Sequence, residues 1–163
     1  MLEAIENAKK LVMDPSWPRP IDKFPKDSNV NCWGFALDGM KIPVLQERTY
    51  YSEITGLSEN LFNFFKSIGL NPRVISTVEQ KSPDELVFLF YIYEYKYSDF
   101  INEIWETRTE CHAARIELNG TVVEKANSRS KPVITSLEGI TERLFEQDNV
   151  HVLPILFAVR KPQ

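Results

Sequence analysis

Two residues, Cys32 and His112, are of the types that carry nucleophilic chemistry. Cys32 follows a proline-rich stretch and opens an apolar segment. Asn31 before it is a good N-cap, so we expect a helix to begin at about residue 31. A helix N-terminus offers free backbone N–H groups and a partial positive charge, which favour a reactive thiolate and can hold a developing oxyanion. The alternative for Cys32 is the role of most free cysteines, a small buried hydrophobic side chain.

His112 begins a predicted strand whose pairing can be derived from the turn that follows it. Asn119-Gly120 is the strongest short hairpin signal, and as a two-residue turn it places Leu118 opposite Thr121. Counting back along both strands from that pair places His112 opposite Asn127. Their Cβ atoms are then expected to lie about 5 Å apart.

The same register gives two further pairs that support it. Arg115 lies opposite Glu124, which is a favourable opposite-charge pair, and Ala113 lies opposite Ala126 on the same face. Because these pairs are independent of any functional argument, they favour the register that joins His112 to an asparagine.

Cys32, His112 and Asn127 follow one another in the order of the Cys–His–Asn set of papain-like enzymes. In such a set the histidine takes the thiol proton, and the asparagine side-chain oxygen accepts from the other imidazole nitrogen and fixes the ring. We therefore predict that these three residues are catalytic and act on the carbonyl of an amide (peptide or isopeptide) or of a thioester. Hydrolysis, deamidation and acyl transfer share this machinery, and the sequence leaves the choice among them open.

The segment Asn31-Cys32-Trp33-Gly34-Phe35-Ala36 resembles the cysteine motif of the NlpC and CHAP amidases, within the papain-like cysteine amidase and peptidase superfamily. In CHAP domains the nucleophilic cysteine opens a helix, and an aromatic residue follows three positions later and then an alanine, as in this segment. The histidine of that group begins a β-strand, and a polar orienting residue lies on the next strand, which matches His112 and Asn127. In architecture the resemblance covers residues 28–160.

The resemblance implies an α+β fold of the papain-like NlpC/CHAP type, in which the Cys-bearing helix packs on a mostly antiparallel β-sheet. The chain departs from the CHAP pattern at Val30, where a glycine often stands, and in the 80-residue step from Cys32 to His112. It also shows no secretion signal, which argues against peptidoglycan as the substrate but not against catalysis by the cysteine.

The residues around the cysteine and a tyrosine stripe are candidates for substrate contact. We predict that Trp33 and Asn31 bind substrate, because Trp33 could line the cleft and Asn31 could donate a hydrogen bond to the oxyanion. A core position is the alternative for Trp33. Tyr91, Tyr93, Tyr95 and Tyr97 alternate along one strand and form either a stacking platform for substrate or a half-exposed sheet face.

The remaining cysteine and histidine are expected to be structural. Cys111 adjoins His112 in a strand, so its side chain points to the opposite face and is expected to be buried. His151 stands alone in the last predicted strand. No CxxC or HxxxH spacing joins these residues, so we predict no metal site and no cofactor.

The composition excludes several other functions. A net charge of -4 gives no general attraction to nucleic acid or to anionic membranes. With 6 glycines and no GxxxxGK or GxGxxG string, a phosphate-binding loop is not expected. No apolar run is long enough to span a membrane, and residues 1–13 lack the apolar core of a secretory signal, so we expect a cytoplasmic protein with free thiols.

The pattern along the chain predicts a single domain over residues 1–163, in which 1–27 are a helix and a proline-rich N-terminal extension and 28–163 are the catalytic core. Residues 41–56 are expected to be loop. We expect helices at 1–13, from about 31, at 58–68 and at 137–145, and strands at 73–78, 86–97, 110–118, 121–127 and 150–159. This order of elements is typical of the α+β class.

A second function remains open, that of a catalytically inert interaction or immunity-type module on the same fold. An exposed aromatic stripe and an acidic balance would suit a protein partner. Thiol reactivity separates the two hypotheses, because a triad cysteine is alkylated fast well below the free-thiol pKa of about 8.5 and a core cysteine is not.

Overall fold

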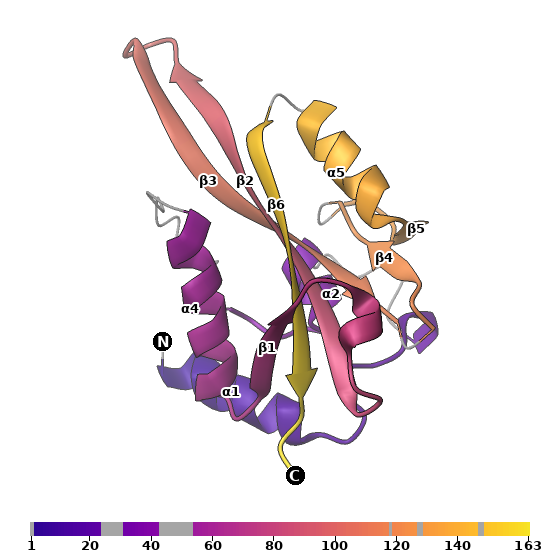
Figure 1. Cartoon of the computed structure of the whole chain (residues 1–163). Coiled ribbons are helices and arrows are strands. Elements are labelled where there is room, and N and C mark those ends of the chain that lie inside the picture. The colour runs from indigo at the N-terminus through magenta and orange to yellow at the C-terminus, as the bar shows by residue number, and fades with distance from the viewer. Residues whose placement is uncertain (1, 24–30, 43–53, 118, 127–128, 147–148) are drawn as a thin grey trace.

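The computed structural model describes residues 2–23, 31–42, 54–117, 119–126, 129–146 and 149–163, and these form an α+β protein (Figure 1). The described helices are α1 (Leu2–Met13), α2 (Cys32–Ala36), α4 (Ile54–Ser67) and α5 (Leu137–Glu146), with 3₁₀ turns η1 (Ile21–Lys23) and η2 (Val78–Gln80). The strands are β1 (Asn71–Ile75), β2 (Glu85–Asp99), β3 (Ile104–Ile116), β4 (Val122–Glu124), β5 (Val133–Thr135) and β6 (Asn149–Arg160). They pair in the order β1-β6-β2-β3-β4-β5, and each pairing is antiparallel, which confirms the expected class and sheet.

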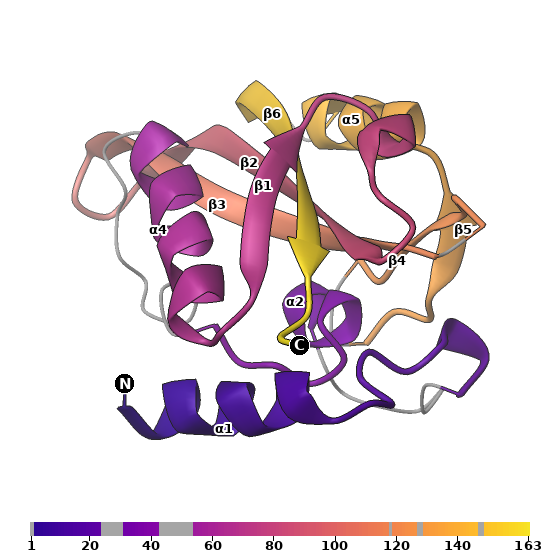
Figure 2. The ribbon, with the colours of Figure 1, turned by 60° about the horizontal axis from the view of Figure 1, so that its bottom comes forward.

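Helices cover both faces of the central part of the sheet, with α1 and α4 on one side and α5 on the other (Figures 1 and 2). On β2, Phe88, Phe90 and Ile92 join the core under α1 and α4, whereas Leu89 and Tyr91 join the core under α5. This alternation explains the near-continuous apolar run in the sequence of β2, because successive side chains enter opposite cores.

A long two-stranded arm is the main departure from the expected strand lengths. β2 and β3 pair from Val87↔Ile116 out to Asp99↔Ile104, so β3 begins at residue 104 rather than at the expected 110. The turn at the tip contains neither glycine nor proline and is held instead by the Asp99 carboxylate, which accepts from the backbone N of Ile101 at 3.0 Å. No glycine or proline marks this turn in the sequence, and for that reason the outer part of β3 was not expected to be strand. α4 likewise begins before the expected residue 58.

The β3–β4 hairpin forms where Asn119-Gly120 predicted it, but its register differs by one residue. The observed pairs are Ala114↔Glu124, Arg115↔Val123 and Ile116↔Val122. The expected Arg115–Glu124 pair is therefore wrong, and Glu124 lies on the face of the sheet that carries His112.

The register differs because the loop has three residues instead of two. Gly120 adopts a positive φ of 84°, whereas Asn119 does not, so the two-residue turn that needs both residues left-handed does not form. The backbone N of Gly120 donates to the carbonyl of Glu117 at 2.8 Å, and the N of Glu117 donates to that of Thr121 at 2.9 Å. The pairing that placed His112 opposite Asn127 is thus wrong, and Asn127 itself lies outside the described residues.

The N-terminal segment is packed into the main core. Ala8 and Val12 of α1 and the Trp17 side chain are buried in the cluster under α1 and α4. This part of the predicted extension therefore shares its core with the strands. Among the described helices, none is both long and apolar enough to cross a membrane.

Candidate active site

The helix that carries the cysteine lies against β3 where β4 has ended. β4 pairs with β3 over Ala114–Ile116, so the stretch of β3 before residue 114 has space beside it for α2. The Trp33 indole Nε1 donates to the Cys111 carbonyl oxygen at 2.8 Å, which fixes the start of α2 beside His112. The Asn31 side chain accepts from the backbone N of Gly34 at 2.9 Å, so the expected N-cap and the helix start at Cys32 are confirmed.

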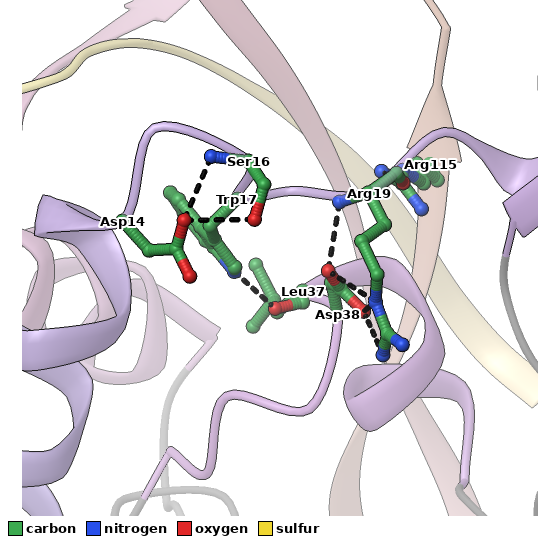
Figure 3. A network of polar contacts seen from close by, with 7 residues as sticks. All are labelled: Asp14, Ser16, Trp17, Arg19, Leu37, Asp38 and Arg115. Carbon is green, nitrogen blue, oxygen red and sulfur yellow. Dashed lines mark hydrogen bonds and ion pairs between the residues drawn. The ribbon is translucent and has the colours of Figure 1, made fainter.

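The other end of α2 is held by the N-terminal segment, as Figure 3 shows. The Trp17 indole Nε1 donates to the Leu37 carbonyl at 2.9 Å. The buried Asp38 carboxylate accepts from the Arg19 backbone N at 2.7 Å and from its guanidinium Nη2 at 2.7 Å. Arg115 of β3 in turn donates through Nη2 to the Arg19 carbonyl. Both ends of a five-residue helix are thereby tied to β3, which gives Cys32 a defined position.

Cys32 and His112 meet, and a glutamate holds the far side of the imidazole. His112 is 5% exposed, and its Nε2 lies 2.6 Å from the Glu124 Oε2. The Cys32 side chain forms a hydrogen bond with the same ring. Burial lowers the pKa of His112, but the hydrogen bonds and charges of Cys32 and Glu124 outweigh it and raise the pKa to about 9. The ring is therefore charged at neutral pH, which favours an imidazolium beside the Cys32 sulfur.

Glu124 is itself held by a cation from the other side. The Arg143 Nη2 of α5 lies 2.5 Å from the Glu124 Oε2. Since Glu124 is only 4% exposed, the buried carboxylate needs such partners to offset its loss of hydration. Cys32, His112, Glu124 and Arg143 thus form one hydrogen-bonded chain from α2 across β3 and β4 to α5.

Glu124 is the residue that the sequence argument missed as a partner of His112. The only local signal is a glutamate at the end of a strand that otherwise reads Val122-Val123, where an unpaired carboxylate would be costly. The expected register paired this residue with Arg115 on the wrong face and so assigned its role to Asn127.

The second cysteine has the environment expected of a structural residue. Cys111 is buried in the core under α1 and α4, on the face of β3 opposite to His112, as predicted. Burial, with a smaller contribution from the charge of Cys32, raises the pKa of the Cys111 thiol well above its usual range. His151, the other histidine, is exposed on β6.

The two predicted substrate-binding residues flank the nucleophile, and each already makes a structural hydrogen bond. The half-buried Trp33 uses its indole N–H on the Cys111 carbonyl and packs against the core, and the exposed Asn31 uses its side-chain oxygen on the Gly34 backbone. Substrate contact by Trp33 or Asn31 stays a prediction.

Among the residues that the structure describes, no group of three or more His, Cys, Asp or Glu side chains is placed so that it could hold a metal ion. No protein-family model matches the chain, and no curated protein matches it significantly.

Proposed function

We propose that the protein is a cysteine hydrolase or acyltransferase of the papain-like type, acting on a peptide, isopeptide or related acyl bond. The observation that carries this proposal is the chain of hydrogen bonds from Cys32 through His112 to Glu124. A buried imidazole with a thiol on one side and a carboxylate on the other is the arrangement of an activated nucleophile with its base and its orienting group. A cysteine-bearing helix that packs on an antiparallel sheet supports the NlpC/CHAP-type fold.

The proposed mechanism assigns one role to each nitrogen of His112. Glu124 holds Nε2, so Nδ1 is left to exchange a proton with the Cys32 sulfur. The thiolate attacks the carbonyl carbon, the C–N bond breaks, and the imidazolium gives its Nδ1 proton to the departing amine. Water or an acceptor amine then attacks the thioester and loses its proton to the neutral ring. The acyl group leaves with the attacking group, and the thiolate and imidazolium are restored.

In this proposal Glu124 takes the orienting role that the sequence argument gave to Asn127. A carboxylate both fixes the ring and stabilises the imidazolium by its charge, whereas an asparagine only fixes the ring. Arg143 orients that carboxylate through its ion pair. The helix dipole contributes less than expected because α2 has only five residues.

The test is to trap an acyl-enzyme. The purified protein is incubated with S-phenyl thioacetate, and the acetylated residue is located by peptide mass spectrometry. We expect acetyl on Cys32, with the label lost in Cys32→Ala, slowed in His112→Ala and kept in Cys111→Ala. Acylation that is absent, or equally fast in His112→Ala, would contradict the proposal.

The tip of the β2–β3 arm favours the second candidate function, an interaction module. Phe100, Ile101 and Trp105 are 83%, 92% and 70% exposed, and the rings of Phe100 and Trp105 form an edge-to-face pair with centroids 6.3 Å apart. Such an apolar tip is costly in water unless a partner covers it. If binding were the whole function, Cys32 would react no faster than a free thiol, so the same trapping experiment separates the two.

A further inference from the structure

A second carboxylate, Glu110, lies on the reactive face of β3 next to the site. It precedes His112 by two residues, so both side chains project from the same face of the strand. Its cross-strand neighbour is Tyr93, whose hydroxyl donates to the Glu110 Oε2 at 2.9 Å. The Tyr95 hydroxyl donates to the other oxygen, Oε1, at 3.2 Å. Two tyrosines of the stripe therefore hold this carboxylate in one orientation.

Glu110 lies close enough to Cys32 that the charges of both residues act on the same side chain, that of Tyr93. The pKa of Tyr93 is raised first by burial and then by the charge of Glu110, and the charge of Cys32 contributes as well. His112 contacts Cys32 and lies two residues from Glu110 on the same face of β3. A substrate whose carbonyl carbon lies at the Cys32 sulfur therefore has neighbouring atoms within range of Glu110.

Glu110 differs from the buried carboxylates of the protein in that it makes no ion pair with any side chain that the structure describes. Glu124 pairs with Arg143, and Glu85 pairs with Arg73 at 2.7 Å. The described partners of Glu110 are the neutral hydroxyls of Tyr93 and Tyr95. The glutamate is exposed, so its remaining lone pairs face solvent, and the tyrosine rings beside it offer faces that attract cations.

We propose that Glu110, Tyr93 and Tyr95 form a subsite for a cationic group of the substrate, an ammonium or guanidinium near the acyl group that Cys32 attacks. This inference rests on the proposed function, because it assigns the substrate class of the same site. A fixed carboxylate with two free lone-pair directions binds such a cation by charge-assisted hydrogen bonds. The tyrosine stripe is then a substrate platform as well as a sheet face.

A test that does not depend on turnover compares two thiol reagents of opposite charge at Cys32. The cationic 2-aminoethyl and the anionic 2-sulfonatoethyl methanethiosulfonates are reacted with the full chain, and modification is assigned by mass spectrometry. We expect the cation-to-anion rate ratio at Cys32 to fall about tenfold in Glu110→Gln. The matched control is Glu94→Gln, which removes the same charge from a neighbouring position on the opposite face of β2, and here the ratio is expected to stay within about twofold.

A second arm identifies where the cation sits in a substrate. Thiobenzyl esters of Nα-acetyl-lysine, of glycine and of Nα-acetyl-norleucine offer a side-chain ammonium, an α-ammonium and no charge. One of the two cationic esters is expected to acylate Cys32 faster than the norleucine ester, and Glu110→Gln is expected to remove that preference.

A reagent ratio that is unchanged in Glu110→Gln, or that falls equally in Glu94→Gln, would overturn the subsite. Failure of the proposed function gives a different result, in which His112→Ala leaves the absolute reaction rate at Cys32 unchanged whatever the ratio.

Discussion

Cys111 and His112 are consecutive residues of β3 whose side chains face opposite sides of the sheet, and the two sides are built differently. The side of Cys111 is an aromatic core under α1 and α4, in which the Phe65 ring lies 5.6 Å from that of Phe157 and 6.0 Å from that of Phe90. The side of His112 carries, next to the apolar core under α5, the polar chain that ends at Arg143. A thiol on the first side is inert, whereas an imidazole on the second is held charged.

Within β3, the residues that stabilise the fold are thus separated from the residue that takes part in the chemistry. Burial of aromatic rings stabilises the fold roughly in proportion to the apolar area removed from water. Burial of His112 and Glu124 stabilises the fold only by the part of their attraction that exceeds their desolvation, and that part depends on pH. We therefore expect changes on the aromatic side to act mainly on the free energy of unfolding, and changes on the polar side to act mainly on the reactivity of Cys32.

The largest expected effect is on reactivity, from His112→Ala. Without the imidazole, Cys32 loses its base and its counterion, so the acylation rate is expected to fall about 10²- to 10⁴-fold. The control is His151→Ala, which removes the other, exposed histidine and leaves the rate unchanged. Acylation kinetics followed by mass spectrometry check both variants, and an equal loss of rate in the two would contradict the role of His112.

The matching change on the aromatic side is Phe65→Ala. Its ring is fully buried, so truncation is expected to destabilise the protein by about 3–5 kcal/mol through lost burial and a residual cavity. Phe145→Ala, at a half-exposed position of α5, is expected to cost about 1 kcal/mol or less. Urea unfolding measures both, and the acylation rate of the folded Phe65→Ala protein is expected to stay close to that of the wild type. A large loss of that rate would show that the two sides are not separate.

The raised pKa of His112 predicts a dependence of stability on pH. Its value of about 9 in the folded state exceeds the ordinary 6.5, so its stabilising contribution is fully present below pH 6.5 and is lost as the pH rises through about 9. The loss corresponds to about 3 kcal/mol. Urea unfolding across this range measures it, with His112→Gln as the reference that lacks the titrating group. Equal pH profiles for wild type and variant would contradict the assignment.

A smaller effect is expected from Glu124→Gln, which keeps the shape of the side chain and removes its charge. The rate of Cys32 acylation is expected to fall roughly ten- to a hundredfold, and the pKa of His112, measured by NMR titration, is expected to fall as well. Glu142→Gln, at an exposed position next to Arg143 on α5, is the control and leaves both values unchanged. If Asn127→Ala lowers the rate more than Glu124→Gln does, the orienting role returns to Asn127.

The start of the reactive helix and the existence of the hairpin could be predicted because each depends on a local signal. Asn31 caps its own helix through a bond three residues away, and Gly120 takes the left-handed conformation that the hairpin needs. The class of fold followed from the same kind of signal, namely the period of the apolar residues along each element.

The partner of His112 could not be predicted because it depends on a choice between two loop lengths. A two-residue and a three-residue loop both use Gly120, and they differ in whether Asn119 is left-handed as well. That one-residue difference exchanges the faces of the second strand, so it decides whether Glu124 or its neighbour reaches His112. The role of Arg143 could not be predicted for another reason. Its contact with Glu124 joins two residues that are 19 positions apart and meet only through tertiary packing.

The pH profile of iodoacetamide labelling, assigned to each cysteine by mass spectrometry, shows whether Cys32 and His112 form a reactive thiolate–imidazolium pair. We expect Cys32 of the wild-type protein to be labelled much faster at about pH 6.5 than Cys32 of His112→Ala, while Cys111 stays unlabelled until the protein unfolds. In His112→Ala the labelling of Cys32 is expected to become slow at about pH 6.5 and to rise with pH like that of a free thiol. Slow and equal labelling of both cysteines in the wild-type protein at neutral pH would contradict the pair.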